Sequence, residues 1–63
     1  MESLAYAKCN EAKATIAAGD YRTALRLCDQ VIRLACKEKD HAILADAMVL
    51  KGISHRRLAQ VSC

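Results

Sequence analysis

The segment GDYRTAL, residues 19–25, interrupts a sequence that otherwise has a helical pattern. Gly19 can adopt the left-handed backbone conformation that ends a helix, and the Asp20 side chain can accept hydrogen bonds from the free N–H groups that begin the next one. One helix therefore ends and another begins within two residues. Because so short a connection makes consecutive helices antiparallel neighbours, this segment predicts a helical hairpin.

The residues on either side of this connection predict one helix over 3–18 and another over 21–37. Ser3 is the candidate N-cap of the first. In both helices apolar residues, most of them small, recur every three or four positions, which is typical of a face that packs against another helix. These residues are Ala5, Cys9, Ala12 and Ile16 in the first helix, and Tyr21, Ala24, Cys28, Val31 and Ala35 in the second. The opposite side of the 21–37 helix carries Arg22, Arg26, Asp29, Arg33 and Lys37, which we expect to face solvent.

A third helix is predicted over 41–60, with Asp40 as its N-cap. Asp40 is the only stop signal in KEKDH, residues 37–41, so one continuous helix from 21 to about 59 is the alternative. Its predicted apolar face consists of Leu44, Ala45, Met48, Val49, Gly52, Ile53, Leu58 and Ala59. Glycine inside a helix costs about 1 kcal/mol relative to alanine, so we expect another helix to approach closely at Gly52. Val49, Ile53 and Leu58 are expected either in the core or on a flank left open for a partner.

The composition also favours an all-α fold. The chain has 63 residues, no proline, two glycines and two tyrosines as its only aromatic residues. Turn-rich β structure needs more glycine and proline than this. A chain of this length buries only about 60% of the surface that it exposes when unfolded, so we expect support from a neighbouring segment or a second copy. The end of the sequence, LAQVSC, residues 58–63, has no second helix after it, and we expect the natural chain to continue.

Charge and hydropathy exclude several classes of partner. The net charge is +3, and acidic residues alternate with basic ones, so the field that would attract nucleic acid is weak. No apolar run approaches the roughly 18 residues of a membrane span, and the first residues lack the pattern of a signal peptide. The sequence therefore predicts a cytoplasmic protein.

The cysteines do not predict a disulfide framework or a metal site. Cys28 and Cys36 lie on one predicted helix, about 12 Å apart along its axis, which is beyond the reach of a disulfide. We expect reduced thiols, with Cys9, Cys28 and Cys36 as small core residues. The gaps between the four cysteines, including Cys63, are 19, 8 and 27 positions, which do not fit zinc ligation.

Catalytic residues and cofactors are not predicted either. Neither His41 nor His55 has a cysteine nucleophile and an orienting group beside it in a recognisable arrangement. The two glycines are too far apart for a phosphate-binding loop. The sequence gives no support for enzymatic activity, so a surface that binds another protein is the remaining expectation.

The order of small and turn residues resembles the tetratricopeptide repeat family. The residues that carry the resemblance are Ala12, Gly19, Asp20, Tyr21 and Ala24. A second copy resembles the first helix of such a repeat in ADAMVLKGISHRRLAQ, residues 45–60, where Gly52 takes the place of Ala12 at a distance of 40 positions rather than the usual 34. Lys8, Val31 and the absence of proline depart from the family pattern. The resemblance implies about one and a half repeats in a three-helix array, forming a single domain with a non-catalytic, protein-binding or scaffold function.

A weaker resemblance leads to a second hypothesis. AAGDYRTALRLCDQVI, residues 17–32, is also similar to the microtubule-interacting and transport domain, a three-helix bundle. That resemblance implies binding of helical tails from membrane-remodelling proteins. The aromatic residue usual near the middle of its last helix is missing from LKGISHRRLAQ, residues 50–60. A homo-oligomerisation element, pairing through the third helix, is a further alternative.

The tetratricopeptide resemblance also implies which residues would contact a ligand, because such arrays bind mainly through the first helix of each repeat. The matching positions are Lys8, Glu11, Thr15, Met48, Lys51, His55 and Arg56. Four of them are cationic or can become so, which suits an acidic peptide or a carboxylate terminus.

Overall fold

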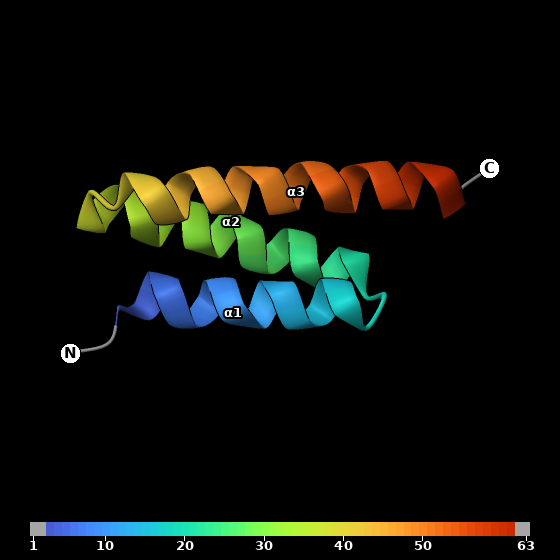
Figure 1. Cartoon of the computed structure of the whole chain (residues 1–63), viewed down its shortest axis with the longest axis horizontal. Coiled ribbons are helices and arrows are strands. Elements are labelled where there is room, and N and C mark those ends of the chain that lie inside the picture. Colours follow the sequence, from blue (N-terminus) through green and yellow to red (C-terminus); the bar gives the residue numbers. More distant parts are fainter. Residues whose placement is uncertain (1–2, 62–63) are drawn as a thin grey trace.

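The computed structural model describes residues 3–61, which form three α-helices and no strand. The helices are α1 (Leu4–Ala17), α2 (Tyr21–Glu38) and α3 (His41–Val61). The all-α prediction is therefore confirmed. Figure 1 shows α2 lying between α1 and α3, and α2 packs closely against both while α1 and α3 make few contacts with each other.

The connection between α1 and α2 has the predicted capping residues. Gly19 has a φ of 85°, in the left-handed region, and the Asp20 carboxylate accepts a hydrogen bond of 3.3 Å from the Thr23 N–H. At the start of α1, the Ser3 hydroxyl accepts a hydrogen bond of 3.2 Å from the Tyr6 N–H. The Ser3 hydroxyl also donates to the Glu38 carboxylate, which ties the start of α1 to the end of α2. The predicted hairpin and both predicted caps are confirmed.

The connection between α2 and α3 is a true turn, so the continuous-helix alternative is wrong. Lys39 takes the left-handed conformation with a φ of 56°, although it is not a glycine. The Asp40 N–H then donates to the Ala35 carbonyl at 2.9 Å, and the Asp40 carboxylate accepts from the Ile43 N–H at 3.1 Å. The N-cap at Asp40 is confirmed, and α2 ends one residue later than predicted.

The core is built from small side chains. The buried residues are Ala5, Cys9, Ala12, Ala24, Cys28, Val31, Ala35, Ala47 and Ser54. Small side chains let helices approach closely, since the distance between helix axes depends on the side chains at the contact. Half-buried Ile32, Ile43 and Leu50 close over the cluster of Cys9, Val31 and Ala47. The predicted faces of α1 and α2 are confirmed, with Ile16 and Tyr21 half-buried at their ends.

The buried side of α3 lies about half a turn from its predicted apolar face, and Val49, which the sequence left open between the core and an exposed flank, is exposed. Ala47 and Ser54 are buried against the other helices, whereas Ala45, Met48 and Val49 are exposed. Ser54 can be buried because its hydroxyl donates a hydrogen bond of 2.9 Å to the Leu50 carbonyl. Three other residues of the predicted face, Leu44, Ile53 and Leu58, are half-buried. Ala59, like Ala45, is exposed.

Two further expectations fail. Gly52 is exposed, and a Cβ built on it would meet nothing within 4 Å, so no other helix of residues 3–61 approaches it closely. Cys36 is a free, exposed thiol rather than a core residue, because it lies on the side of α2 away from the buried stripe. Cys9 and Cys28 are buried and free, as predicted, while Cys63 lies outside the described residues.

Candidate partner-binding surface

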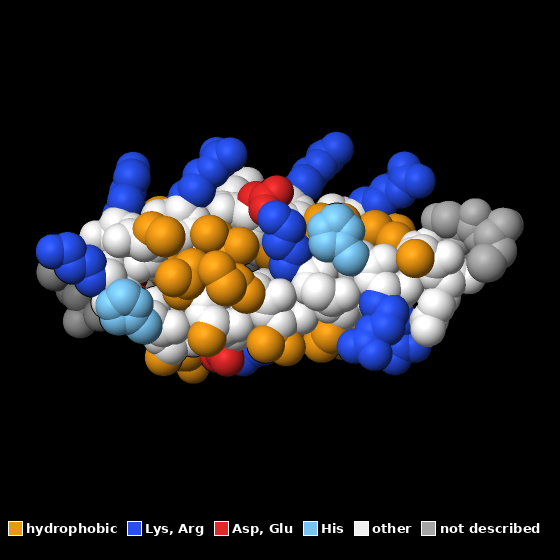
Figure 2. Space-filling model, turned by 90° about the horizontal axis from the view of Figure 1, so that it is seen from above, with side chains coloured by type: hydrophobic (Ala, Val, Ile, Leu, Met, Phe, Trp, Pro, Cys, Tyr) orange, Lys and Arg blue, Asp and Glu red, His pale blue; other side chains and the backbone are white. Residues whose placement is uncertain are grey.

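The side of α3 that points away from the core is apolar. We call it the α3 outward face, and it consists of Ala42, Ala45, Met48, Val49 and Gly52. At 100° per residue these positions cluster opposite Ala47 and Ser54, the buried residues of the same helix. Figure 2 looks onto this side of the molecule and shows hydrophobic side chains gathered over the N-terminal half of α3.

The two largest side chains of the α3 outward face are well exposed. Met48 is 57% and Val49 62% exposed to solvent. An apolar side of a helix is normally covered, and the N-terminal half of α3 is apolar on two opposite sides, of which α2 and α1 cover only one. Exposed apolar patches on soluble proteins often mark sites of interaction. The N-terminal half of α3 therefore has the composition of a helix with a second packing partner.

A row of cations lies beside this face. We call it the α2 cationic row, and it consists of Arg22, Arg26, Arg33 and Lys37, all exposed. The spacing of the row places all four side chains on one side of α2. Figure 2 shows cationic side chains projecting in line along one long edge of the molecule. The α2 cationic row and the α3 outward face therefore belong to one continuous surface.

The pair of Asp29 and Lys51 fixes how α2 and α3 are aligned. The Lys51 ammonium on α3 donates to the Asp29 carboxylate on α2 at 2.9 Å. Because the two helices run antiparallel, this contact sets Arg33 and Lys37 level with the N-terminal half of α3, where the outward face lies. Arg22 and Arg26 are level with the C-terminal half.

Asp29 lies between Arg26 and Arg33 in the sequence, but its negative charge does not cancel the positive charge of the α2 cationic row. The hydrogen bond from Lys51 is the largest influence that lowers the pKa of the Asp29 carboxyl, and the positive charges of Lys51, Arg33 and His55 lower it further. Asp29 is therefore ionised near neutral pH, and its charge is balanced by Lys51. The four cations of the row keep their net positive field.

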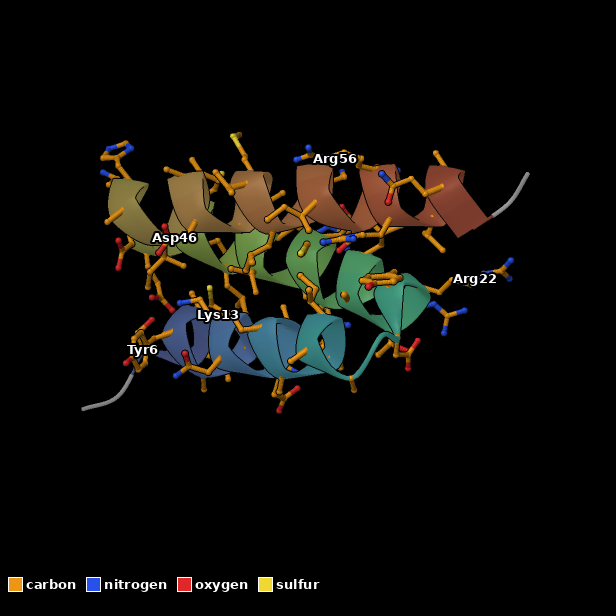
Figure 3. The ribbon with its side chains drawn as sticks, turned by 45° about the vertical axis from the view of Figure 1, so that its right-hand side comes forward. Tyr6, Lys13, Arg22, Asp46 and Arg56 are labelled. Carbon is orange, nitrogen blue, oxygen red and sulfur yellow. The ribbon has the colours of Figure 1, made fainter. Side chains whose placement is uncertain are left out.

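A hollow of about 320 Å³ lies along the C-terminal half of α3. It is lined by Ile53, Arg56, Arg57 and Gln60. Two guanidinium groups at this end extend the positive charge beyond the α2 cationic row. In Figure 3 the labelled Arg56 lies on the upper side of α3, away from α1.

The structure separates the predicted ligand residues into two groups. On α3, Met48, His55 and Arg56 are exposed, and Lys51 is half-buried in its pair with Asp29. On α1, Glu11 is exposed, whereas Lys8 and Thr15 are half-buried. The Thr15 hydroxyl donates to the Ala12 carbonyl of its own helix at 2.8 Å.

The α1 group lies on the side of its helix turned away from α3. Cys9 of α1 packs in one buried cluster with Ala47 of α3. Lys13 lies one turn further along α1 on the same side as Cys9, so it marks the side of α1 nearest α3. Figure 3 shows the labelled Lys13 and Asp46 on the facing sides of these two helices. Lys8, Glu11 and Thr15 are about 140° or more from Lys13 around the helix, so they do not join the α3 group in one site.

The described residues 3–61 do not have the arrangement of a metal site. No group of three or more His, Cys, Asp or Glu side chains lies close enough there to hold a metal ion. Burial raises the pKa of both the Cys9 and the Cys28 thiols, which keeps them protonated and poorly nucleophilic. Within the same range, no helix combines the length and apolar character needed to cross a membrane.

No protein-family model, curated protein or solved structure matches the chain. The resemblance to tetratricopeptide repeats is carried by Ala12, Gly19, Asp20, Tyr21, Ala24 and Gly52 alone.

Proposed function

We propose that the chain is a non-catalytic protein-interaction or scaffold module of the tetratricopeptide type, which binds a segment of another protein. The exposed α3 outward face is the observation that carries this proposal. Met48 and Val49 are more than half exposed on a helix whose opposite side is already packed. Covering this face with a partner segment would remove apolar surface from water, which is the dominant favourable term in most protein association.

The packing of the chain supports the same function. Its core consists of small side chains, so little apolar area is buried between the helices themselves. A thin core in a short chain leaves a narrow margin of stability, to which a bound partner would add by mass action. The free thiols of Cys9, Cys28 and Cys36 suit a reducing compartment, and we propose a cytoplasmic setting.

A selection from a displayed peptide library tests the proposal. The chain is immobilised in reducing buffer, and enriched peptides are sequenced and synthesised. We expect convergence on apolar residues spaced i, i+3 or i+4, and i+7, the pattern of a helix that docks through one face. Val49→Lys should abolish binding of these peptides. Tyr6→Lys is the matched control, because Tyr6 is a similarly exposed apolar residue (54%) on α1.

Two results contradict the proposed function. One is a selection that returns no convergent sequence. The other is a set of peptides that bind the Val49→Lys variant as tightly as the unchanged chain, since binding would then occur away from the α3 outward face.

A further inference from the structure

We propose that the partner on the α3 outward face is an amphipathic helix whose flanking side chains are acidic. This inference rests on the proposed function and names the chemistry of the partner. It combines two observations, the shape of the apolar face and the sign of the charges around it.

The shape of the face suits a helix. Ala45, Val49 and Gly52 follow one another at intervals of four and three residues, so they form a single ridge along α3. Their side chains are short, and the space above Gly52 is open. A second helix can therefore lie close against this ridge. Met48, at its side, is a flexible and adaptable contact for such a partner.

The charges around the face select an acidic partner. Arg33 and Lys37 of the α2 cationic row flank its N-terminal half, and Arg56 lies at its C-terminal end. Asp29 is balanced by Lys51, which leaves Asp46 as the acidic side chain of α3 near the face, on the side toward α1. A helix with carboxylates on both flanks of its apolar stripe would meet opposite charge on the α2 side and at the C-terminal end.

The same charges disfavour a second copy of this chain. If two α3 outward faces pair antiparallel about a two-fold axis, both α2 cationic rows come to the same side of the interface and repel each other. If they pair in parallel, the cations of each C-terminal half, including Arg56, meet their own counterparts. Either arrangement brings like charges together, which costs binding free energy.

A membrane surface fits less well than an acidic helix. Helices that lie in a lipid interface insert large side chains such as Trp, Phe and Leu. The α3 outward face offers alanine, glycine, one valine and one methionine, and no aromatic residue.

The test uses a pair of synthetic peptides about as long as α3, labelled with a fluorophore. Both carry the same apolar residues at i, i+3, i+4 and i+7. One has glutamate at every flanking position and its twin has lysine there. Binding to the whole chain is measured by fluorescence anisotropy in reducing buffer. We expect the glutamate peptide to bind at least about tenfold more tightly at low salt, and the ratio to shrink as salt screens the charges. Equal binding of the twins, or tighter binding of the lysine peptide, overturns the inference.

Charge-reversal variants locate the effect. The double variant Arg33→Glu with Lys37→Glu should weaken binding of the glutamate peptide at least about tenfold. Lys8→Glu with Lys13→Glu changes the net charge by the same amount on α1 and should leave binding unchanged within about twofold, because α1 packs against the Ala47 side of α3, opposite the outward face. Circular dichroism checks that both variants remain helical. If both double variants lose the same amount of affinity for the glutamate peptide, net charge alone sets the affinity, and the inference is overturned.

Further measurements separate the failure of this inference from failure of the proposed function. Library-selected peptides that depend on Val49 but show no preference for acidic flanks would leave the function standing and remove the acidic partner. Binding to vesicles of phosphatidylserine and phosphatidylcholine with no binding of either twin would overturn the inference in favour of a membrane. A dimer that persists on dilution in light scattering, and that Val49→Lys dissociates, would overturn it in favour of a second copy. If neither synthetic peptide binds and the library selection returns no convergent sequence, the proposed function is contradicted as well.

Discussion

The Lys51 ammonium on α3 lies 2.9 Å from the Asp29 carboxylate on α2, and this exposed ion pair joins the two helices that build the candidate surface. The side chains of Lys51 and Asp29 remain 39% and 53% exposed. The pair therefore aligns α2 with α3 more than it stabilises them, because exposed ion pairs contribute little free energy.

Removing this ion pair should cost little stability at neutral pH. We expect Lys51→Met to lower the free energy of unfolding by about 0.2–1 kcal/mol, and by less in high salt. Because the pKa of Asp29 is lowered in the folded chain, the contribution of the pair is present above the unfolded-state value near 3.8. It is lost as the pH falls through the lower folded-state pKa. Urea unfolding at pH 7 and pH 3 measures both effects, with Lys13→Met as control. If Lys51→Met lowers the free energy of unfolding by the same amount at both pH values, the effect does not come from the ion pair with Asp29.

The two left-handed residues of the turns should respond to substitution in opposite directions. Lys39 adopts a φ of 56° that costs a non-glycine residue about 1 kcal/mol, so Lys39→Gly should stabilise the chain by up to that amount. Gly19→Ala should destabilise it by a similar amount, even though a Cβ there meets no other atom within 4 Å. Thermal unfolding of both variants is the measurement. A Gly19→Ala variant as stable as the unchanged chain would show that the turn relaxes away from this geometry.

Gly52→Ala should separate stability from binding. Glycine inside a helix is less favourable than alanine by about 0.5–1 kcal/mol, and space for the added methyl group is open. The variant should therefore be more stable by about that amount in urea unfolding. The same methyl group stands on the α3 outward face, so we expect weaker binding of the glutamate peptide. A variant that is more stable and binds unchanged would show that the partner does not approach Gly52 closely.

Buried Cys9 and Cys28 should react more slowly than exposed Cys36, and their burial should make the stability of the chain depend on pH above 9.0. Cys36 should be alkylated quickly by iodoacetamide, whereas Cys9 and Cys28 should react only when the chain opens, as peptide mass spectrometry can resolve. Burial raises the pKa of both buried thiols above 9.0. The contribution of these two thiols to the free energy of unfolding is therefore fully present below that pH. It is lost as the pH rises through their folded-state pKa values. Cys9→Ala and Cys28→Ala should flatten this fall. Equal labelling rates for all three thiols would contradict the described packing.

Much of the fold follows from local sequence signals. Gly19 and Asp20 each have a definite physical role in a tight turn, so the hairpin could be predicted from them. The charged strip of α2 leaves one side of that helix for packing, which is why Ala24, Cys28, Val31 and Ala35 were predicted correctly. In the second turn, Asp40 was informative, but the left-handed conformation of Lys39 has no sequence signal, because lysine adopts it only when the surrounding chain imposes it.

The orientation of α3 could not be predicted for a different reason. Its N-terminal half is apolar on two opposite sides, so the pattern alone does not choose between Ala47 and Ala45 as the buried position. Ser54 adds to the ambiguity, because its burial depends on a hydrogen bond to the Leu50 carbonyl. For the same reason Val49 was left open between the core and an exposed flank, and the α3 outward face was not predicted as one surface, although Met48 was expected to contact a ligand. The signal that could have found it is the presence of more apolar residues than one packing face can use.

The most direct test of the account is a two-dimensional ¹H–¹⁵N spectrum of the labelled chain, recorded while the glutamate peptide is added. We predict that the largest shift changes fall on Ala45, Met48, Val49 and Gly52, with smaller changes at Arg33 and Lys37. Amides of Lys8, Glu11 and Thr15 should stay in place. Shift changes concentrated on α1, or spread evenly over the three helices, would contradict the assignment of the α3 outward face as the binding surface.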